Sequence, residues 1–196
     1  MPAHLPTTGG NNVFLNVPFD SGYEKLFVAL IATIAAAGFL PRCAVEVSER
    51  GEGRRKRIIE LIQSCPLSIH DLSRTGLPAR FNMPFELGIA EALQHRGGHQ
   101  FIVLESKARR LERTLSDLKG VDPLIHRNGS LVLIARLTDD LDGAEPAVVE
   151  SIYHKLMRTL PQLKNKSRVK DVFQKKIFNE LVSGAIELAN VKGVFE

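Results

Sequence analysis

Cysteine is scarce in this sequence. Only Cys43 and Cys65 occur, each within a hydrophobic stretch, and neither belongs to a CxxC motif or to a Cys/His spacing that suits a metal ion. Two isolated cysteines of this kind favour free thiols in a reducing cytosol over a disulfide framework. A zinc site is not indicated.

Long uncharged hydrophobic runs are also missing. No run of 18 or more apolar residues is free of charges, and the apolar segment Leu26–Leu40 is too short to cross a bilayer. The opening residues, MPAHLPTTGGNN, lack the basic start and the small-residue cleavage site of a secretory signal. We therefore expect a cytoplasmic protein with no membrane partner.

Several motifs for phosphate binding and catalysis are absent as well. The sequence has no GxGxxG after its first expected strand and no GxxxxGK[ST], which leaves a Rossmann dinucleotide site and a P-loop unsupported. It also has no GxSxG and no HExxH, so serine-hydrolase and zinc-hydrolase chemistry are unsupported. The remaining candidates for chemistry are carboxylates: Asp20, Glu46, Asp71 and Glu86.

The composition that remains is typical of a globular protein, with 196 residues of which 44% are hydrophobic. The formal charge is +4, and the excess of basic residues lies mainly near the end, where residues 151–196 hold nine Lys or Arg against four Asp or Glu. Binding of nucleic acid by this basic tail therefore stays open. Such binding would weaken steeply as the salt concentration rises.

Short β-like runs alternate with amphipathic helical stretches up to about Gly129, a pattern typical of a parallel sheet covered by helices. We expect strands at residues 13–17, 42–47, 66–73 and 99–106, with a short fifth within 122–129, and helices at 23–39, 54–65, 81–93 and 109–120. The prediction is an α/β domain over residues 1–128. Its sheet is open, mostly parallel and of four to five strands with flanking helices, of the flavodoxin-like or Rossmann-like type.

The rest of the chain, residues 129–196, forms a helical extension in three expected pieces, at 130–141, 146–160 and 169–189. The break between the last two, LPQLKNKSR at 160–168, has the composition of a polar hinge or loop. The extension either packs on the core or forms a surface for an oligomer or another partner, and the sequence leaves both open.

Ligands of open α/β sheets bind outside the carboxyl ends of the strands. Polar groups follow each of the first three expected strands, and others open the helix at 81–93. We therefore expect Asn16, Asp20, Glu46, Asp71 and Glu86 to converge on one crevice. His70 precedes Asp71, so alternation along the strand points it to the opposite face, where packing or a satisfied hydrogen bond is expected.

Glu86 belongs to the stretch FNMPFELGIAEAL. With Pro84 at the first helical position, an inward stripe of Phe85, Gly88, Ile89 and Ala92 would leave Glu86 beside the buried face, aimed at the crevice. A carboxylate in the first turn is favoured in its ionised form, and the small Gly88 leaves room for a ligand. Equally, Glu86 at the third helical position could close a capping box and have no chemical role.

Three motifs carry a resemblance: VFLNVPFDSGYEKLF, the strand SIHDLS ending in an acid, and FNMPFELGIAEAL before another buried strand. Together they resemble the nucleoside 2-deoxyribosyltransferase superfamily and its relatives with TIR-like folds, over residues 13 to 125. In that superfamily a helix with an E-x-G-x-A pattern carries the catalytic glutamate, which Glu86 matches, and Asp71 matches the acid at a strand end. These transferases usually carry a second acid just before the glutamate, where this chain has Arg80 and Asn82. This difference argues against transfer between free deoxynucleosides. The N-terminal motif, with the SIHDLS and FNMPFELG blocks, is more similar to the bacterial relatives that act as NAD-consuming effectors in phage defence.

The resemblance implies cleavage or transfer of an N-glycosidic bond of a nucleoside or nucleotide, with NAD glycohydrolase activity as the first expectation and no cofactor beyond the substrate. Glu86 would stabilise or trap the oxocarbenium-like sugar, and Asp71 would hold the base or the sugar hydroxyls. The expected substrate-binding residues are Asn16, Phe19, Asp20, Tyr23, Glu46, Arg54, Asn82, Met83 and Gly88. Phe19 or Tyr23 would stack on the base, and the run Arg54–Arg57 would bind phosphates, although core packing and a solvated basic face stay open for these residues.

Two other functions stay open. A non-catalytic module of a bacterial defence or signalling system could bind a nucleotide without turning it over. A response-regulator receiver is disfavoured, because the acidic pair after the first strand and the lysine after the fifth are missing. A partner through the C-terminal helices, a second copy or a defence protein, is compatible with each of these functions.

Overall fold

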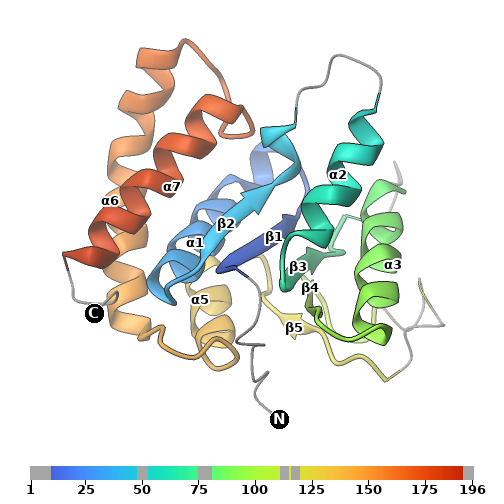
Figure 1. The fold of residues 1–196 in the computed structure, drawn as a ribbon. Helices are drawn as coiled ribbons and strands as arrows, with labels where there is room; N and C mark the ends of the chain where they lie inside the picture. The colour runs from blue at the N-terminus through green and yellow to red at the C-terminus, as the bar shows by residue number, and fades with distance from the viewer. Residues whose placement is uncertain (1–9, 48–52, 75–80, 111–114, 116–119, 192–196) are drawn as a thin grey trace. The chain divides into compact units, whose positions relative to one another are not determined.

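The computed structural model describes residues 10–47, 53–74, 81–110, 115 and 120–191 (Figure 1). Five strands form one parallel sheet in the order β2-β1-β3-β4-β5, which confirms the predicted α/β fold with a helical C-terminal part. The strands are β1 (Asn12–Asn16), β2 (Leu40–Cys43), β3 (Leu67–Asp71), β4 (Gln100–Glu105) and β5 (Leu124–Ile125). The helices are α1 (Glu24–Ala36), α2 (Arg54–Gln63), α3 (Asn82–His95), α5 (Ser130–Thr138), α6 (Pro146–Ser167) and α7 (Lys175–Asn190).

The central strands are buried on both faces, as is typical of parallel strands covered by helices, although β3 carries the polar residues Ser68, His70 and Asp71. All five residues of β3 are buried, and Ile69 pairs with Leu15 of β1 on one side and with Ile102 of β4 on the other. The chain order of the strands reverses between β1 and β3. A reversal of this kind opens a crevice at the carboxyl ends of the two strands, where ligands of such sheets bind.

The second predicted strand is half wrong. Residues 42–47 alternate like a strand, but β2 ends at Cys43 and the chain turns into the short 3₁₀ helix η2 (Ala44–Glu46). The cause is Glu46, whose carboxylate accepts a hydrogen bond of 2.8 Å from the backbone N–H of Cys43. This side-chain contact satisfies a donor that a longer strand would have paired with its neighbour.

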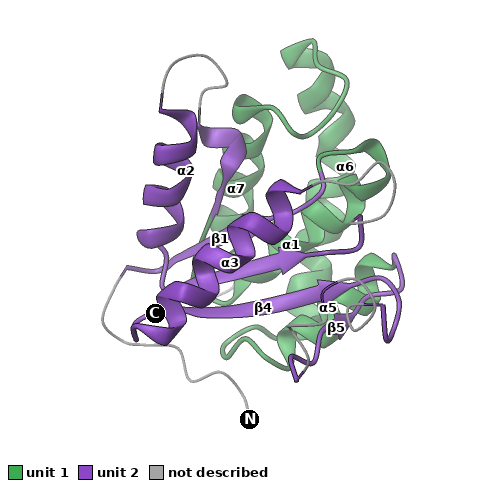
Figure 2. Cartoon of the chain, turned by 90° about the vertical axis from the view of Figure 1, so that its right-hand side faces the viewer, with its two compact units in different colours: residues 1–2, 19–41, 129–196 green, residues 3–18, 42–128 purple. Residues whose placement is uncertain are grey.

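The described chain forms two compact units, which Figure 2 distinguishes by colour. Unit 2 comprises residues 3–18 and 42–128 and holds β1, β3, β4, β5, α2 and α3. In this unit α2 and α3 lie side by side and pack on one face of the sheet, on two clusters of buried apolar side chains. One contains Phe14 and Ile62, and the other contains Leu72, Met83 and Val103.

Unit 1 comprises residues 1–2, 19–41 and 129–196, so that α1 belongs with the C-terminal helices. Helices α5, α6 and α7 all pack on α1, whose residues from Leu26 to Ala36 are buried throughout. The predicted hinge at 160–168 is wrong, because α6 continues through Pro161 to Ser167. Burial of Leu156 and Leu160 just before the proline holds the helix together despite the hydrogen bond that the proline removes.

The other predicted elements agree with the structure to within a few residues, with two qualifications. The helix α7 begins at Lys175 and not at residue 169. The predicted helix at 109–120 falls largely outside the described residues. Within the described part of the chain, every helix is too short or too polar to cross a membrane.

Candidate active site at the carboxyl ends of β1 and β2

The helix α3 carries Glu86 on its buried face, in a different phase from the predicted one. The helix starts at Asn82, so Pro84 is its third residue, and its buried residues are Met83, Glu86, Leu87 and Ala90. The predicted inward stripe is therefore wrong, and Phe85 is 54% exposed. The phase is set by Met83 and Leu87, which pack against Leu72, just after β3, and Val103 of β4.

Glu86 does not cap its own helix. It is the fifth helical residue, and no side chain caps the N-terminus of α3 by a hydrogen bond, so the capping-box alternative is wrong. Although Glu86 is only 6% exposed, no residue in the described part of the chain forms a hydrogen bond with its carboxylate. Burial raises the pKa of Glu86 from 4.5 to about 7, which corrects the expectation of a fully ionised group.

Among the described residues, Arg54 supplies the positive charge that acts on Glu86. Its charge lowers the pKa of Glu86 and so opposes part of the effect of burial. Arg54 is the first residue of α2 and follows Gly53, whose φ of 85° suits glycine. One of its guanidinium nitrogens, Nη1, donates a 2.6 Å hydrogen bond to the carbonyl oxygen of Val47, which anchors the side chain.

Cys43 and Glu46 lie at the end of β2 in the same unit. Cys43 is fully buried, and its pKa is raised to about 12 by burial and, to a lesser degree, by the charges of Glu46 and Glu86. Its thiol therefore stays protonated. The carboxylate of Glu46 accepts hydrogen bonds from Arg42 Nε at 3.1 Å and from the Cys43 backbone, so it supports the turn η2 and is not a free ligand group.

Both cysteines are free and buried, as predicted. Burial raises the pKa of Cys65 to about 11. Neither thiol has the lowered pKa that a nucleophilic cysteine needs.

Asn16, the last residue of β1, ties this strand to the start of α3. Its Nδ2 lies 2.8 Å from the carbonyl oxygen of Met83 and 2.9 Å from Nδ1 of His70. Nε2 of His70 lies 2.7 Å from the hydroxyl oxygen of Ser68, which in turn lies 2.8 Å from Nε2 of His99. These buried side chains form the Asn16–His99 chain, and His70 therefore has the satisfied hydrogen bonds that we expected.

Asp71 lies on the other face of the sheet from Glu86. Alternation along β3 places it opposite His70, and His70 is bonded on the face that α3 covers. Asp71 is fully buried, and its carboxylate accepts hydrogen bonds from the backbone N–H and the hydroxyl of Ser73 and lies 3.0 Å from Nε2 of His126. The expected convergence of Asp71 and Glu86 on one crevice is therefore wrong.

The grouping of Ser73, His126 and Asp71 is not a hydrolytic triad. The backbone N–H of Asn128 donates to Nδ1 of His126 at 3.0 Å, so the ring carries its proton on Nε2. Ser73 and Asp71 both contact this protonated nitrogen, and the Ser73 hydroxyl donates to Asp71. A nucleophilic serine would instead need the histidine as the acceptor of its proton.

Three predicted binding residues belong to unit 1 and have partners there. Phe19, which is 37% exposed, stacks on Phe173 with ring centroids 5.3 Å apart. Tyr23 is 1% exposed, and its backbone N–H donates to the carbonyl oxygen of Asp20 at 2.9 Å. These contacts match the alternative in which both aromatic residues serve packing.

The remaining predicted residues lie at the start of α3. Asn82 is exposed, whereas the side chain of Met83 is in the core. Gly88 is also exposed, and of the described residues none lies within 4 Å of a Cβ placed on it. The space beside Gly88 is therefore open, and its expected role in leaving room for a ligand stays a prediction.

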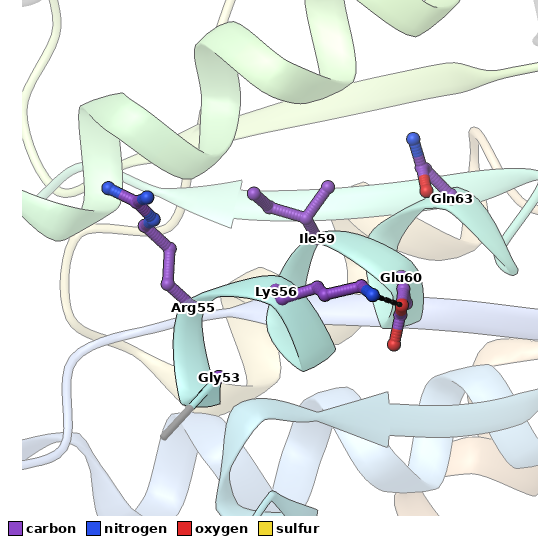
Figure 3. Close-up of a pocket in the computed structure, with 6 residues that line it drawn as sticks. All are labelled: Gly53, Arg55, Lys56, Ile59, Glu60 and Gln63. Atoms are coloured by element: carbon purple, nitrogen blue, oxygen red, sulfur yellow. Dashed lines mark ion pairs between the residues drawn. The ribbon is translucent and has the colours of Figure 1, made fainter.

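The basic run at the start of α2 divides between two environments. Arg54 interacts with Glu86, whereas Arg55 and Lys56 line an open hollow of about 590 Å³ along α2, shown in Figure 3. The hollow is completed by Gly53, Ile59, Glu60 and Gln63. Within it, Lys56 pairs with Glu60 at 3.8 Å, and both side chains are exposed. This hollow includes neither Glu86 nor Asn16, and its composition is that of a solvated basic face.

The charge of Glu86 interacts with Cys43 and Arg54, and Asn16 bonds to the backbone of Met83, three residues before Glu86 on α3. We name these four residues, Asn16, Cys43, Arg54 and Glu86, the Glu86 site. Sequence reasoning missed Cys43 and the partners of Asn16. A usable signal existed, because Ser68 and His70 are two polar residues on the same face of the buried strand β3. Among the described residues, no three His, Cys, Asp or Glu side chains are grouped in a way that could hold a metal ion.

Comparison of the sequence with models of known protein families finds no match, and comparison with curated proteins finds none either.

Proposed function

We propose that this protein cleaves the N-glycosidic bond of a nucleotide at the Glu86 site, with NAD as the first candidate substrate. The observation that carries the proposal is the state of Glu86. A carboxyl group that is 6% exposed, lacks a hydrogen-bond partner among the described residues and has a pKa raised to about 7 is costly for the fold. Perturbed carboxyl groups of this kind gather at functional sites.

A positive charge in the ligand would recover that cost. The sugar becomes oxocarbenium-like when an N-glycosidic bond breaks, and a carboxylate beside it replaces the solvation that burial removed. The interaction is stronger in the transition state than with the resting substrate, which is the condition for catalysis. A pKa near 7 also lets Glu86 accept a proton from the water that attacks the sugar at neutral pH.

The position of Asp71 favours a pyridinium over an ordinary base as the leaving group. Most bases leave an N-glycosidic bond only when an acid protonates them, and Asp71 is buried on the other face of the sheet with partners of its own. A nicotinamide ring needs no acid. When its bond to C1′ breaks, the electron pair neutralises the ring nitrogen, and nicotinamide leaves while water adds to the sugar and gives its proton to Glu86.

Arg54 has two parts in this proposal. Its charge keeps a larger fraction of Glu86 ionised than burial alone would allow. We also assign to it the binding of a substrate phosphate, because a guanidinium at the first turn of a helix joins its own charge to that of the helix N-terminus.

The test is to incubate the purified protein with NAD and with a panel of deoxynucleosides, and to separate the products by chromatography. The wild type should release nicotinamide, and Glu86→Gln should abolish the release while leaving the fold intact. Glu91→Gln, the same change five residues later on α3, is the matched control and should retain activity.

Two outcomes would contradict the proposal. Release of bases from deoxynucleosides but not of nicotinamide from NAD would refute the substrate. Binding of NAD measured by calorimetry, with no product after long incubation, would refute the reaction and leave a nucleotide-sensing module in its place.

A further inference from the structure

The Asn16–His99 chain has a fixed direction of hydrogen bonding, which can be followed from its buried end. Nδ1 of His99 lies 2.7 Å from the carbonyl oxygen of Cys65, and a carbonyl can only accept, so this nitrogen carries the ring proton. Nε2 of neutral His99 is then an acceptor, and it takes the hydroxyl proton of Ser68. The Ser68 oxygen in turn accepts from Nε2 of His70.

The direction of the last two bonds follows. His70 carries its proton on Nε2, so its Nδ1 must accept, and the donor is Nδ2 of Asn16 at 2.9 Å. The second hydrogen on Nδ2 goes to the carbonyl oxygen of Met83 at 2.8 Å, which is again an acceptor only. The carbonyl oxygens of Cys65 and Met83, which accept the hydrogen bonds at the two ends of the Asn16–His99 chain, therefore require the same orientation of the Asn16 amide.

Both rings must be neutral for this direction to hold, and their surroundings keep them so. Burial lowers the pKa of His70 to about 3, with a smaller contribution from His99, and burial also lowers the pKa of His99. Both ring nitrogens of each histidine have a partner in the chain.

The orientation leaves one atom of Asn16 unused. Both hydrogens of its amide are taken, whereas no residue in the described part of the chain donates to its carbonyl oxygen Oδ1. Asn16 as a whole is only 3% exposed. It stands at the carboxyl end of β1, where ligands of such sheets bind.

We propose that the Asn16–His99 chain locks the Asn16 amide so that it presents a fixed acceptor to the Glu86 site, and that this acceptor selects a sugar hydroxyl of the substrate. The inference rests on the proposed function and specifies what the site recognises. A freely rotating amide would offer a donor or an acceptor equally well. A locked amide accepts only, and on the ribose that carries the scissile bond the hydroxyl groups are the donors.

The first experiment measures the ring tautomers by ¹⁵N NMR on the wild type without ligand, at neutral pH. His99 should carry its proton on Nδ1, and His70 on Nε2. The histidine signals can be assigned with His95→Gln and His154→Gln, which remove histidines that are not part of the Asn16–His99 chain. A proton on Nδ1 of His70 would overturn the inference whatever the activity. The expected tautomers with no release of nicotinamide would instead overturn the proposed cleavage and leave the lock standing.

The second experiment measures binding in the Glu86→Gln background, where turnover is absent. The probes are NAD and its analogues that lack the 2′- or the 3′-hydroxyl of the nicotinamide ribose. One analogue should bind about tenfold more weakly than NAD, and Asn16→Ala should reduce this difference to about twofold or less. Asn12→Ala, at the other end of the same strand, is the matched control and should keep the full difference.

Two results of this second experiment would overturn the selection of a hydroxyl: equal binding of NAD and both analogues, or a difference that Asn16→Ala leaves unchanged. If Asn16→Ala does not fold, equal binding of NAD and both analogues to Glu86→Gln still overturns the selection. No binding of NAD would refute the selection as well.

Discussion

Replacing Glu86 with glutamine should change stability in a way that depends on pH. The pKa of Glu86 is raised from 4.5 to about 7 in the folded protein, mainly by burial, so the folded state holds the proton more tightly than the unfolded state does. Between these two pH values the folded state binds more protons, and the wild type loses stability as the pH rises. The contribution is complete below about pH 4.5 and is lost above about pH 7.

The size of the effect follows from the same pKa values. One pKa unit corresponds to about 1.4 kcal/mol, so a rise from 4.5 to about 7 costs the folded protein about 3 kcal/mol at alkaline pH. Glutamine has nearly the same shape and no charge. On going from pH 4.5 to pH 8, the free energy of unfolding of Glu86→Gln should therefore rise by about 3 kcal/mol relative to that of the wild type, although the variant loses activity.

The assay is unfolding by urea followed by circular dichroism, at pH 4.5 and at pH 8, for both proteins. A buried amide has its own cost at both pH values, so the decisive quantity is the change in the difference between variant and wild type. Glu91→Gln corrects for the loss of a carboxylate on the same helix. A difference between Glu86→Gln and wild type that is the same at both pH values would refute the account of Glu86.

Three further predictions concern other parts of the molecule. Arg54→Gln should raise the pKa of Glu86 further, because the substitution removes the positive charge that lowers this pKa. NMR titration of the Glu86 carboxyl carbon measures the shift, and an unchanged or lower pKa would contradict the interaction between Arg54 and Glu86. Pro161→Ala should raise the free energy of unfolding by about 1–2 kcal/mol, because it restores a helical hydrogen bond in α6. Pro146→Ala, at the first helical position, should not raise it, and equal effects of the two variants in urea titrations would contradict this account. Cys43 should resist alkylation by iodoacetamide in the native protein and react in urea, because it is buried and its pKa is raised to about 12. Mass spectrometry measures the labelling, and fast labelling of Cys43 in the native protein would contradict its buried position.

The strands were predictable where burial makes the sequence unambiguous. The runs that form β1 and β4 are apolar apart from their ends, which is typical of short central strands of a parallel sheet, whereas β3 also carries Ser68, His70 and Asp71. The end of β2 was not predictable in this way. The alternation of residues 42–47 fits a strand, and the contact that stops it, between the Glu46 carboxylate and the backbone of Cys43, leaves no trace in a hydrophobic pattern.

The phase of α3 shows a second limit. Its sequence offers two apolar stripes, one through Met83 and Leu87 and one through Phe85 and Ile89, and local pattern alone cannot choose between them. The choice depends on packing against Leu72 and Val103, which other parts of the chain bring to this face of the sheet. The candidate role of Glu86 was accessible from the sequence, but its burial was not, because burial follows from this phase.

Alternation correctly separated His70 from Asp71, yet it could not say which of them would share a face with Glu86. That outcome depends on the side of the sheet to which α3 returns after β3. The Asn16–His99 chain records the result, since it joins β1, β3 and the first turn of α3.

The composition of unit 1 bears on how the protein tolerates shortening. Eleven residues of α1 are buried, and the helices that cover them come from beyond residue 128. Loss of the last third of the chain, by proteolysis or by premature termination, would expose the apolar residues of α1 to solvent and favour aggregation of the remaining fragment. The C-terminal helices therefore shield from solvent an apolar helix that the chain forms near its beginning.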